Sequence, residues 1–279
     1  VVVHYLMEAG VRPGDEVAIG CTGSFPALNI SVLSATQAMG LKATLISSAG
    51  SSQFGANHPG LMWPDMERLL NEAGILDARA LAVSRGGFRD SAAGMTDATR
   101  RLLDDAISRT DHTRLEPASL RDSIDQRIEL YSGNRRSIDH YAAYINVGGG
   151  AASIGGSNGN EQLGCGLVRP KRRLAVTVSD PIDSVAMRFL DADIALINMI
   201  QVEALAKRHG LPIAPTQRPA VGQGGIYQFR QHRRSFAAVG IVLLLGITTV
   251  VIRPPPRFTK LYSNVSRRHH APSLPRWMV

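Results

Sequence analysis

The sequence has 279 residues, enough for one large globular domain with appended segments. Its formal net charge is +8, but the ten Lys and Arg residues from Arg218 onward are accompanied by no Asp or Glu, and the residues before Arg218 carry 21 basic against 23 acidic side chains. Binding of a phosphate backbone requires a basic face on the folded domain. The nearly neutral body therefore argues against a nucleic acid as partner.

Five apolar runs predict buried strands, and several of them are apolar on both faces, as in a parallel sheet that helices cover on both sides. The predicted strands are 16–20, 43–47, 78–83, 142–147 and 193–198. Helical periodicity predicts helices over 26–39, 63–73, 96–108, 120–131, 181–190 and 200–209, and the first ten residues resemble the middle of a helix. Gly40, Gly74 and Gly210 follow three of these helices, in the position where a glycine commonly ends a helix.

The alternation of strands and helices with short connections predicts an α/β fold with a doubly wound (Rossmann-like), mainly parallel sheet and helices on both faces. We expect this domain over residues 1–215, followed by a linker rich in Pro, Gln and Gly over residues 216–234. The stretch 155–171 has no clear period and is expected to be an irregular excursion. Because the sequence opens within a helix and without Met, we expect a missing N-terminal piece, with an anchor or signal.

A hydrophobic segment follows the linker. Residues 235–252 form a charge-free run of roughly 18 residues, about what a ~30 Å hydrocarbon layer requires. Arg233, Arg234 and Arg253 bracket the run. The alternative is a buried core helix, which is disfavoured because the segment has no polar face and no further domain follows it. The sequence therefore predicts a transmembrane helix at 235–252, contact with a lipid bilayer, and a basic, disordered tail over 253–279.

Cysteine and histidine usage gives no sign of a cofactor or metal. Cys21 and Cys165 are either two buried thiols or one bridge in an oxidising compartment. The histidines are scattered, and the pair at residues 269–270 has no carboxylate companions, so no metal site is expected. The glycines over 148–156 do not form a clean dinucleotide-binding motif, and no acidic residue ends the second strand to hold a ribose. No cofactor is therefore expected.

The segments that follow the predicted strands are rich in glycine and small polar residues. In a doubly wound sheet, ligands bind beyond the carboxyl ends of the strands, and such residues leave backbone N–H groups free for an anionic or polar ligand. Tight turns between strands and helices need the same composition, so that interpretation stays open. The candidate ligand-binding residues are Thr22, Gly23, Ser24, Asn29, Ser48, Asn57, Gly86, Gly87, Asn146, Gly148, Gly149 and Gly150.

Ser24 also suggests a catalytic hypothesis. It lies at a turn from strand to helix, where hydrolases place their nucleophile, and His58 could serve as the base with Asp90 orienting it. Phe25 and Pro26 do not fit the small residues expected after such a nucleophile. The alternative is that Ser24 caps the following helix and that His58 is a solvated loop residue.

Several motifs resemble the poly-γ-glutamate system proteins. They include VAIGCTGSFPALNI (17–30), WPDME (63–67), NVGGGAASIG (146–155) and AKRHGLP (206–212). The run GSFPALN (23–29) is the most specific part, and the likeness extends from residue 1 to about residue 227. Proteins of that family are bacterial, associated with the membrane, and encoded with machinery that makes or exports poly-γ-glutamate. The resemblance implies a pathway and a location, but no reaction.

Taken together, these features predict an accessory or ligand-binding protein of poly-γ-glutamate biosynthesis or export, anchored in a bacterial cell membrane with its domain on the external face. Its cleft would hold an anionic ligand such as a glutamyl chain end. The expected partners are the synthesis and export machinery, the lipid bilayer and the glutamyl polymer, but no nucleic acid. Two alternatives stay open: a serine-dependent hydrolase or transferase that acts on glutamyl amide bonds through Ser24, and a non-catalytic scaffold for synthase subunits.

Overall fold

The structure is a computed structural model of the whole chain, and it describes residues 1–52, 56–170, 182–217 and 234–252. The chain divides into two compact units, Val1–Arg218 and Pro219–Val279. The predicted domain end at residue 215 lies close to this division. The predicted tail over 253–279, and all but the ends of the predicted linker over 216–234, lie outside the described residues.

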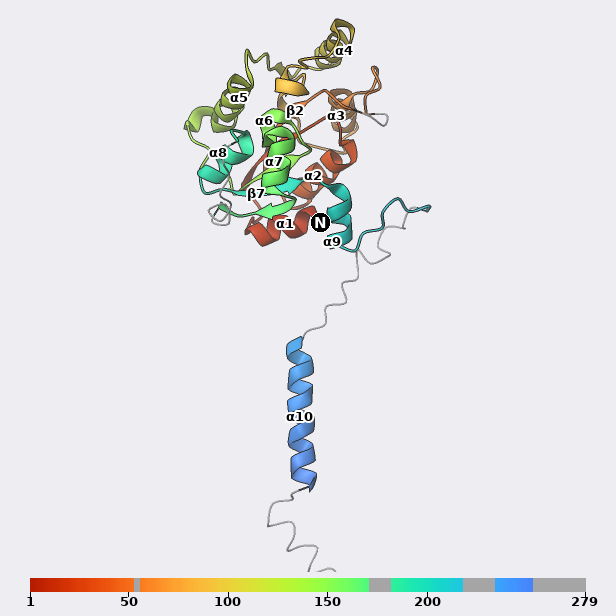
Figure 1. Cartoon of the computed structure of the whole chain (residues 1–279), viewed down its shortest axis with the longest axis vertical. Coiled ribbons are helices and arrows are strands. Elements are labelled where there is room, and N and C mark those ends of the chain that lie inside the picture. The colour runs from red at the N-terminus through yellow and green to blue at the C-terminus, as the bar shows by residue number, and fades with distance from the viewer. Residues whose placement is uncertain (53–55, 171–181, 218–233, 253–279) are drawn as a thin grey trace, which may run out of the picture. The chain divides into compact units, whose positions relative to one another are not determined.

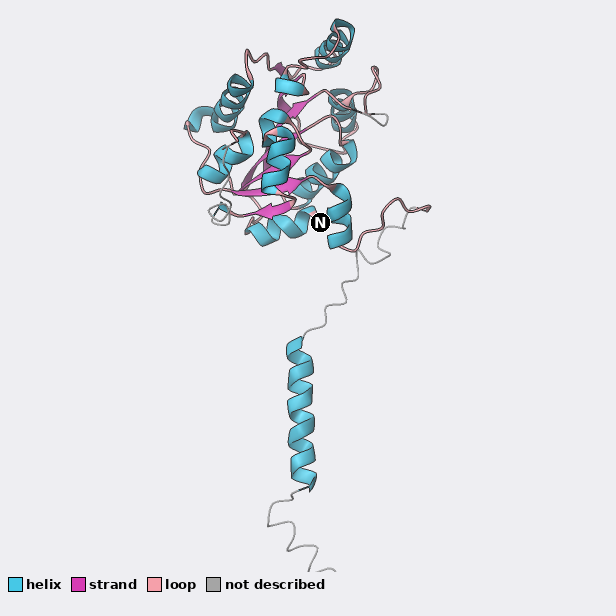
Figure 2. Cartoon of the chain, viewed as in Figure 1, coloured by secondary structure: helices cyan, strands magenta, loops and turns pink. Residues whose placement is uncertain are grey.

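The first unit alternates helices and strands (Figures 1 and 2). Its helices are α1 (Val2–Ala9), α2 (Pro26–Ala38), α3 (Trp63–Glu72), α4 (Asp97–Ser108), α5 (Leu120–Ser132), α6 (Ala151–Ile154), α7 (Gly156–Leu163), α8 (Val185–Asp191) and α9 (Val202–Arg208). Its strands are β1 (Glu16–Cys21), β2 (Lys42–Ser48), β3 (Ala80–Ser84), β4 (Thr113–Arg114), β5 (Ala143–Val147), β6 (Gly166–Val168) and β7 (Ala195–Met199). Two 3-10 helices, η1 (Phe88–Asp90) and η2 (Gly133–Arg135), complete the described elements.

The strands form one sheet in the order β4-β3-β2-β1-β5-β7-β6. Neighbouring strands are parallel except for β6, which runs antiparallel to β7 at one edge. Figure 2 shows the sheet in magenta with helices packed around it. The predicted α/β fold with a mainly parallel sheet is therefore confirmed.

Two hydrophobic cores lie on the two faces of the sheet. Alternate residues of β1 point to opposite faces, so Val17 and Ile19 join the core beneath α1, α2, α3, α4 and α9, whereas Ala18 joins the core beneath α5, α6 and α8. In the second core, the rings of Tyr144 and Phe189 stack with centroids 4.6 Å apart. Burial on both faces explains why the strands are almost continuously apolar.

The predicted elements match the observed ones except in short or glycine-rich segments. The five predicted strands correspond to β1, β2, β3, β5 and β7, and Gly40, Gly74 and Gly210 have the positive φ of a helix-ending glycine. The apolar pattern did not predict β4 and β6, which are two and three residues long. The stretch 155–171 was expected to be irregular but contains α7 and β6 in its described part.

The prediction of a transmembrane helix at 235–252 is contradicted by the structure. The second unit contains α10 (Arg234–Ile252), a 19-residue helix with exposed apolar side chains. Within the described parts of the chain, no helix is long and apolar enough to cross a membrane. A span needs about 20 consecutive, predominantly apolar residues, and this helix of 19 residues begins with an arginine. The fold class is therefore α/β without that helix as a membrane span.

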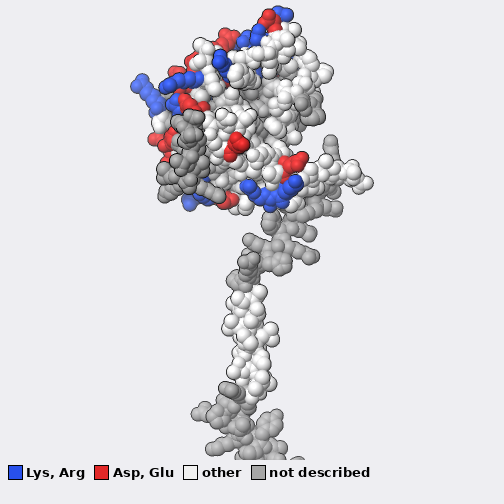
Figure 3. All heavy atoms as spheres, in the orientation of Figure 1, with Lys and Arg blue, Asp and Glu red and all other residues white. Residues whose placement is uncertain are grey.

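Charged side chains of both signs share the visible surface of the first unit. On the face that Figure 3 shows, acidic and basic side chains are interspersed, and the described side chains of α10 are uncharged. Several arginines are paired with carboxylates, as in Arg68–Glu72 at 2.8 Å and Arg188–Asp183 at 2.7 Å. Interspersed, paired charges create no strong field of one sign over this face.

Candidate functional site

The strand order reverses between β1 and β5, which makes this point the topological switch of the sheet. From β1 the chain continues outward through β2, β3 and β4 on one side, whereas β5 and β7 lie on the other side. Ligands of doubly wound folds bind at such a switch, beyond the carboxyl ends of the two central strands. The segments that leave these strands are Thr22–Phe25 and Gly148–Gly150, and both contain candidate residues that the sequence analysis selected.

The two switch-point loops touch one another. A Cβ atom built on Gly148 would lie 2.7 Å from Oγ1 of Thr22 and 3.0 Å from the ring of Phe25. Gly148 also has a φ of +90°, a conformation that residues with a side chain rarely adopt. A Cβ on Gly150 would lie 3.5 Å from Cγ2 of Thr22. Glycine at position 148 is thus required by the contact between the loops and by the backbone.

Two buried asparagines hold the carbonyl groups of these loops. Nδ2 of Asn29 donates to the carbonyl oxygen of Thr22 at 2.9 Å, and Nδ2 of Asn146 donates to that of Gly148 at 2.8 Å. Asn146 donates as well to Oδ1 of Asn198 on the adjacent strand β7, at 2.8 Å. All three asparagines are fully buried, so they shape the loops from beneath. Asn29 and Asn146 therefore act here as positioning residues.

The first turn of α2 faces the switch point without a side-chain cap. Its N-cap residue is Phe25, which makes no capping hydrogen bond, and Pro26 begins the helix. The alternative that Ser24 caps this helix is thus not observed; the backbone N–H of Ser24 donates to Oγ1 of Thr22 at 3.2 Å. The first turn also lacks an acidic residue. An uncapped helix start leaves N–H donors for a ligand.

The loops after β2 and β3 also lie at the carboxyl ends of the strands, next to the switch-point loops. A Cβ on Gly23 would lie 2.5 Å from the carbonyl oxygen of Ala49, and the N–H of Gly50 donates to the carbonyl oxygen of Arg85 at 2.9 Å. A Cβ on Gly86 would lie 2.9 Å from Oγ of Ser48. The structure therefore brings Ser48 and Gly86 beside the switch-point loops. Gly87 is exposed in the same loop.

The predicted catalytic triad is not assembled in this structure. His58 is exposed, like its neighbour Asn57, and its Nδ1 accepts from the N–H of Gly60 at 3.2 Å. Asp90 is buried and bound to other groups. Among the described residues, no hydrogen bond joins Ser24, His58 and Asp90. The triad stays a prediction without a supporting contact.

Asp90 belongs to a buried polar network that the sequence analysis did not identify. Ser84 donates to Oδ1 of Asp90 at 2.9 Å and Ser123 donates to Oδ2 at 2.6 Å. Arg127 of α5 forms an ion pair with Oδ2 at 2.6 Å and donates to Oγ of Ser84 at 2.9 Å. The four residues are at most 4% exposed. They fix the loop after β3 against α5. Only the fold brings Asp90 and Arg127 together, so the sequence contained no local signal for the pair.

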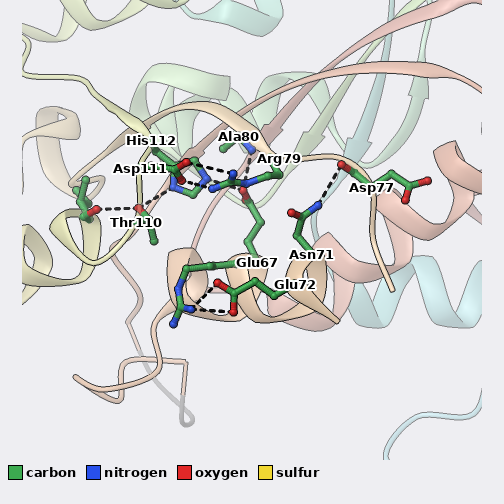
Figure 4. A network of polar contacts seen from close by, with 11 residues as sticks. Glu67, Asn71, Glu72, Asp77, Arg79, Ala80, Thr110, Asp111 and His112 are labelled. Atoms are coloured by element: carbon green, nitrogen blue, oxygen red, sulfur yellow. Dashed lines mark hydrogen bonds and ion pairs between the residues drawn. The ribbon is translucent and has the colours of Figure 1, made fainter. Parts of the chain in front are cut away.

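A second buried network surrounds Glu67 of α3 (Figure 4). Oε1 of Glu67 accepts from the N–H of Ala80 at 2.7 Å and lies 2.9 Å from Nε2 of His112. Nδ1 of His112 lies 2.7 Å from Oγ1 of Thr110, and the hydroxyl of Thr110 is also 2.7 Å from the carbonyl oxygen of Ile107. These bonds fix the imidazole and join α3 to the beginning of β3. Oε1 of Glu67, the N–H of Ala80 and both ring nitrogens of His112 are engaged within the fold, whereas Oε2 of Glu67 is buried without a hydrogen-bond partner among the described residues. We assign this network a structural role.

The loop after β3 is further tied to α4 and β4 through Asp104. Arg85 donates to Asp104 through Nε at 2.6 Å and Nη2 at 2.9 Å, and Arg114 donates to the same carboxylate at 2.6 Å. The hydrogen bond from Arg85 is the largest of the influences that hold the pKa of Asp104 below its ordinary value, and the charge of Arg114 adds to it.

We expect Asp104→Asn to lower the free energy of unfolding by about 1 kcal/mol at neutral pH, because the partners are charged but partly exposed. The lowered pKa in the folded state means that this stabilisation is present above the ordinary pKa of 3.8 and is lost as the pH falls through the folded-state pKa. Urea unfolding between pH 7 and pH 2 measures it. A difference between wild type and variant that stays constant down to pH 2 would contradict this assignment.

The cysteines form no disulfide in the described residues. Cys21 and Cys165 are both free, and Cys21 is buried. Burial, reinforced by the charge of Glu67, raises the pKa of the Cys21 thiol well above its ordinary value, which disfavours the thiolate. Within the described parts of the chain, no group of three or more His, Cys, Asp and Glu residues could hold a metal ion.

No protein-family model, curated protein or solved structure matched the chain. The site must therefore be interpreted from its own geometry: a doubly wound α/β unit whose switch-point loops are rich in glycine and hydroxyl groups and adjoin an uncapped helix start.

Proposed function

We propose that the first unit binds an anionic ligand where β1 and β5 diverge, and that it acts as an accessory binding protein in the making or export of poly-γ-glutamate. The observation that carries the binding proposal is the contact between the Thr22–Phe25 and Gly148–Gly150 loops at the switch of the sheet. The choice of a glutamyl carboxylate rests on the resemblance of residues 17–30 and 146–155, which include both loops, to the poly-γ-glutamate system proteins. The predicted location on the outside of a bacterial membrane stays a prediction.

The electrostatics of the site favour an anion. α2 is 13 residues long, so its aligned peptide dipoles place a partial positive charge at the end that begins with Pro26. No side-chain hydrogen bond caps that end, and the first turn of α2 contains no acidic residue. A carboxylate that accepts hydrogen bonds from backbone N–H groups there would be stabilised by both effects.

A catalytic role for Ser24 is not part of the proposal. In the described residues, no histidine or carboxylate forms a hydrogen bond with Ser24 that would activate its hydroxyl. Ser24→Ala separates the two hypotheses, since a binding site on backbone N–H groups should survive it. Loss of glutamyl amide cleavage in the variant, with binding retained, would instead support the hydrolase or transferase.

Gly148→Ala is expected to weaken binding of a γ-linked glutamate oligomer at least about tenfold, a loss of roughly 1.4 kcal/mol. The added Cβ would lie 2.7 Å from Oγ1 of Thr22 and must push the two loops apart. Isothermal titration calorimetry at low ionic strength measures the effect, with a γ-linked glutamine oligomer as the uncharged comparison.

Gly14→Ala is the matched control. Gly14 has a φ of +89°, nearly that of Gly148, but a Cβ there would meet no atom within 4 Å. The residue precedes β1 and so lies at the amino-terminal ends of the parallel strands, away from the proposed site. Both variants therefore introduce the same backbone strain, and only one disturbs the site. Equal affinities of the two variants for the oligomer would overturn the proposed location of the site.

A further inference from the structure

We infer that Arg89, backed by Phe88, is the cationic residue that recognises an oxyanion, a carboxylate or a phosphate, at this edge of the sheet. The inference rests on the proposed function, because it adds a charged contact to the same site. It concerns residues that neither the motifs nor the composition of the sequence singled out, and four observations support it.

The first observation is the strained backbone that presents Arg89. Arg89 has a φ of 53°, Asp90 of 60° and Ala92 of 55°, three left-handed conformations in non-glycine residues within one short loop. Such conformations are costly and persist only where the surrounding structure enforces them, which is most often at functional sites. The fold therefore keeps this loop in a shape that its own residues do not favour.

The second observation is the group that enforces the strain. Asp90 follows Arg89 directly and is held by Ser84, Ser123 and Arg127 in the buried network described above. The carboxylate of Asp90 cannot leave this network without stranding the buried charge of Arg127. The backbone at Arg89 is consequently held in place before any ligand arrives, so binding need not order this loop.

The third observation is that the guanidinium of Arg89 forms no ion pair with an acidic side chain among the described residues. Arg85 and Arg114, which also lie near the carboxyl ends of the strands, share Asp104. Among the described residues, Arg89 has no acidic partner; its guanidinium lies 5.6 Å from the ring centroid of Phe88, which is 67% exposed. An aromatic ring beside the guanidinium leaves the N–H donors of the cation available, and that planar set of donors matches an oxyanion.

The fourth observation is the location of the loop. η1, which contains Phe88 and Arg89, packs against α6, the helix that begins directly after Gly150. On its other side, a Cβ on Gly50 would lie 2.7 Å from the carbonyl oxygen of Arg85, and Gly50 itself adjoins Gly23. The loop of Arg89 thus borders both switch-point loops.

The experiment compares Arg89→Ala and Arg89→Lys with Arg136→Ala. Arg136 is a close match for Arg89, because it is exposed, has a φ of 58° and lacks an acidic partner among the described residues. It lies between α5 and β5, at the amino-terminal ends of the parallel strands, away from the proposed site. Binding of a γ-linked glutamate oligomer and of inorganic tripolyphosphate is measured at low and high ionic strength. The two probes distinguish a carboxylate ligand from a phosphate ligand.

We expect Arg89→Ala to weaken binding of at least one probe about tenfold or more, as the loss of a hydrogen bond between charged groups predicts. Arg89→Lys should lose less because the charge remains, and Arg136→Ala should bind as the wild type does. The affinity of the wild type should also fall more steeply with salt than that of Arg89→Ala.

The outcomes separate this inference from the proposed function. If Arg89→Ala binds as tightly as Arg136→Ala while Gly148→Ala fails to bind, the inference is overturned and the switch-point site stands. If Arg89→Ala fails to bind while Gly148→Ala does not differ from Gly14→Ala, Arg89 recognises the anion and the proposed site is wrong. If the wild type binds neither probe, both are wrong.

Discussion

Replacing Arg127 by methionine is expected to lower the free energy of unfolding by about 3–5 kcal/mol, the usual cost of leaving a buried charge without its partner. Arg127 and Asp90 are each only 5% exposed in their side chains, and their closest atoms are 2.6 Å apart. Without the guanidinium, the carboxylate of Asp90 would keep only the hydroxyls of Ser84 and Ser123. Urea unfolding followed by circular dichroism measures the loss.

Arg135→Met provides the matched control for this prediction. Arg135 also forms an ion pair at 2.8 Å, with Glu16, but its side chain is 55% exposed. An exposed pair contributes less than about 1 kcal/mol, so the control should be nearly as stable as the wild type. Equal losses in the two variants would show that burial does not determine the strength of the Asp90–Arg127 pair.

A double variant tests the coupling of the pair directly. Asp90→Asn retains the shape of the side chain and the potential to bond with Ser84 and Ser123, while it removes the charge. Combined with Arg127→Met, it should cost about 0.5–3 kcal/mol less than the sum of the single changes, because no buried charge is left unpaired. If the effects simply add, the two residues do not act as a unit.

Glu67→Ala is expected to cost about 3 kcal/mol, since it leaves two buried groups, the N–H of Ala80 and the imidazole of His112, without their partner. Both contacts are short, 2.7 and 2.9 Å, and both join to the same oxygen, Oε1. The loss should be accompanied by faster hydrogen exchange at the amide of Ala80, which begins β3. Urea unfolding and amide exchange measured by NMR together test the assignment.

Two variants on the same helix, α3, sharpen the test. Glu67→Gln retains a side-chain oxygen that can accept from Ala80, so it should lose less than Glu67→Ala. Glu72→Ala removes an exposed carboxylate that pairs with Arg68 at 2.8 Å and should cost less than about 1 kcal/mol. If Glu67→Gln destabilised the protein as much as Glu67→Ala, the charge rather than the hydrogen-bond geometry would be the dominant contribution.

The sequence was sufficient to predict the parts of this protein that depend on local pattern. The central strands are buried on both faces, so runs such as 16–20 and 142–147 are apolar without alternation and stand out from the helices between them. Glycine and small polar residues follow β1, β2, β3 and β5, where tight turns and close loop contacts exclude larger side chains, as at Gly148. The location of the candidate site followed from these two patterns.

Hydropathy alone was not sufficient for the segment at 235–252. Its composition indicated a membrane span, but α10 did not meet the combined requirement for length and apolarity within the described residues. The short edge strands β4 and β6 were not predicted either. Each is only two or three residues long, too short for a pattern of alternation to be visible in the sequence.

The sequence by itself determined the α/β class, the central strands, and the glycine-rich loops that follow them, because propensity and burial act on neighbouring residues. Only the tertiary structure decided which distant polar groups meet. Asp90 pairs with Arg127, Glu67 bonds to His112, and Arg89 has no acidic partner among the described residues. Such pairings depend on how strands and helices pack, and a side chain's partner across the fold leaves no periodic trace in the chain.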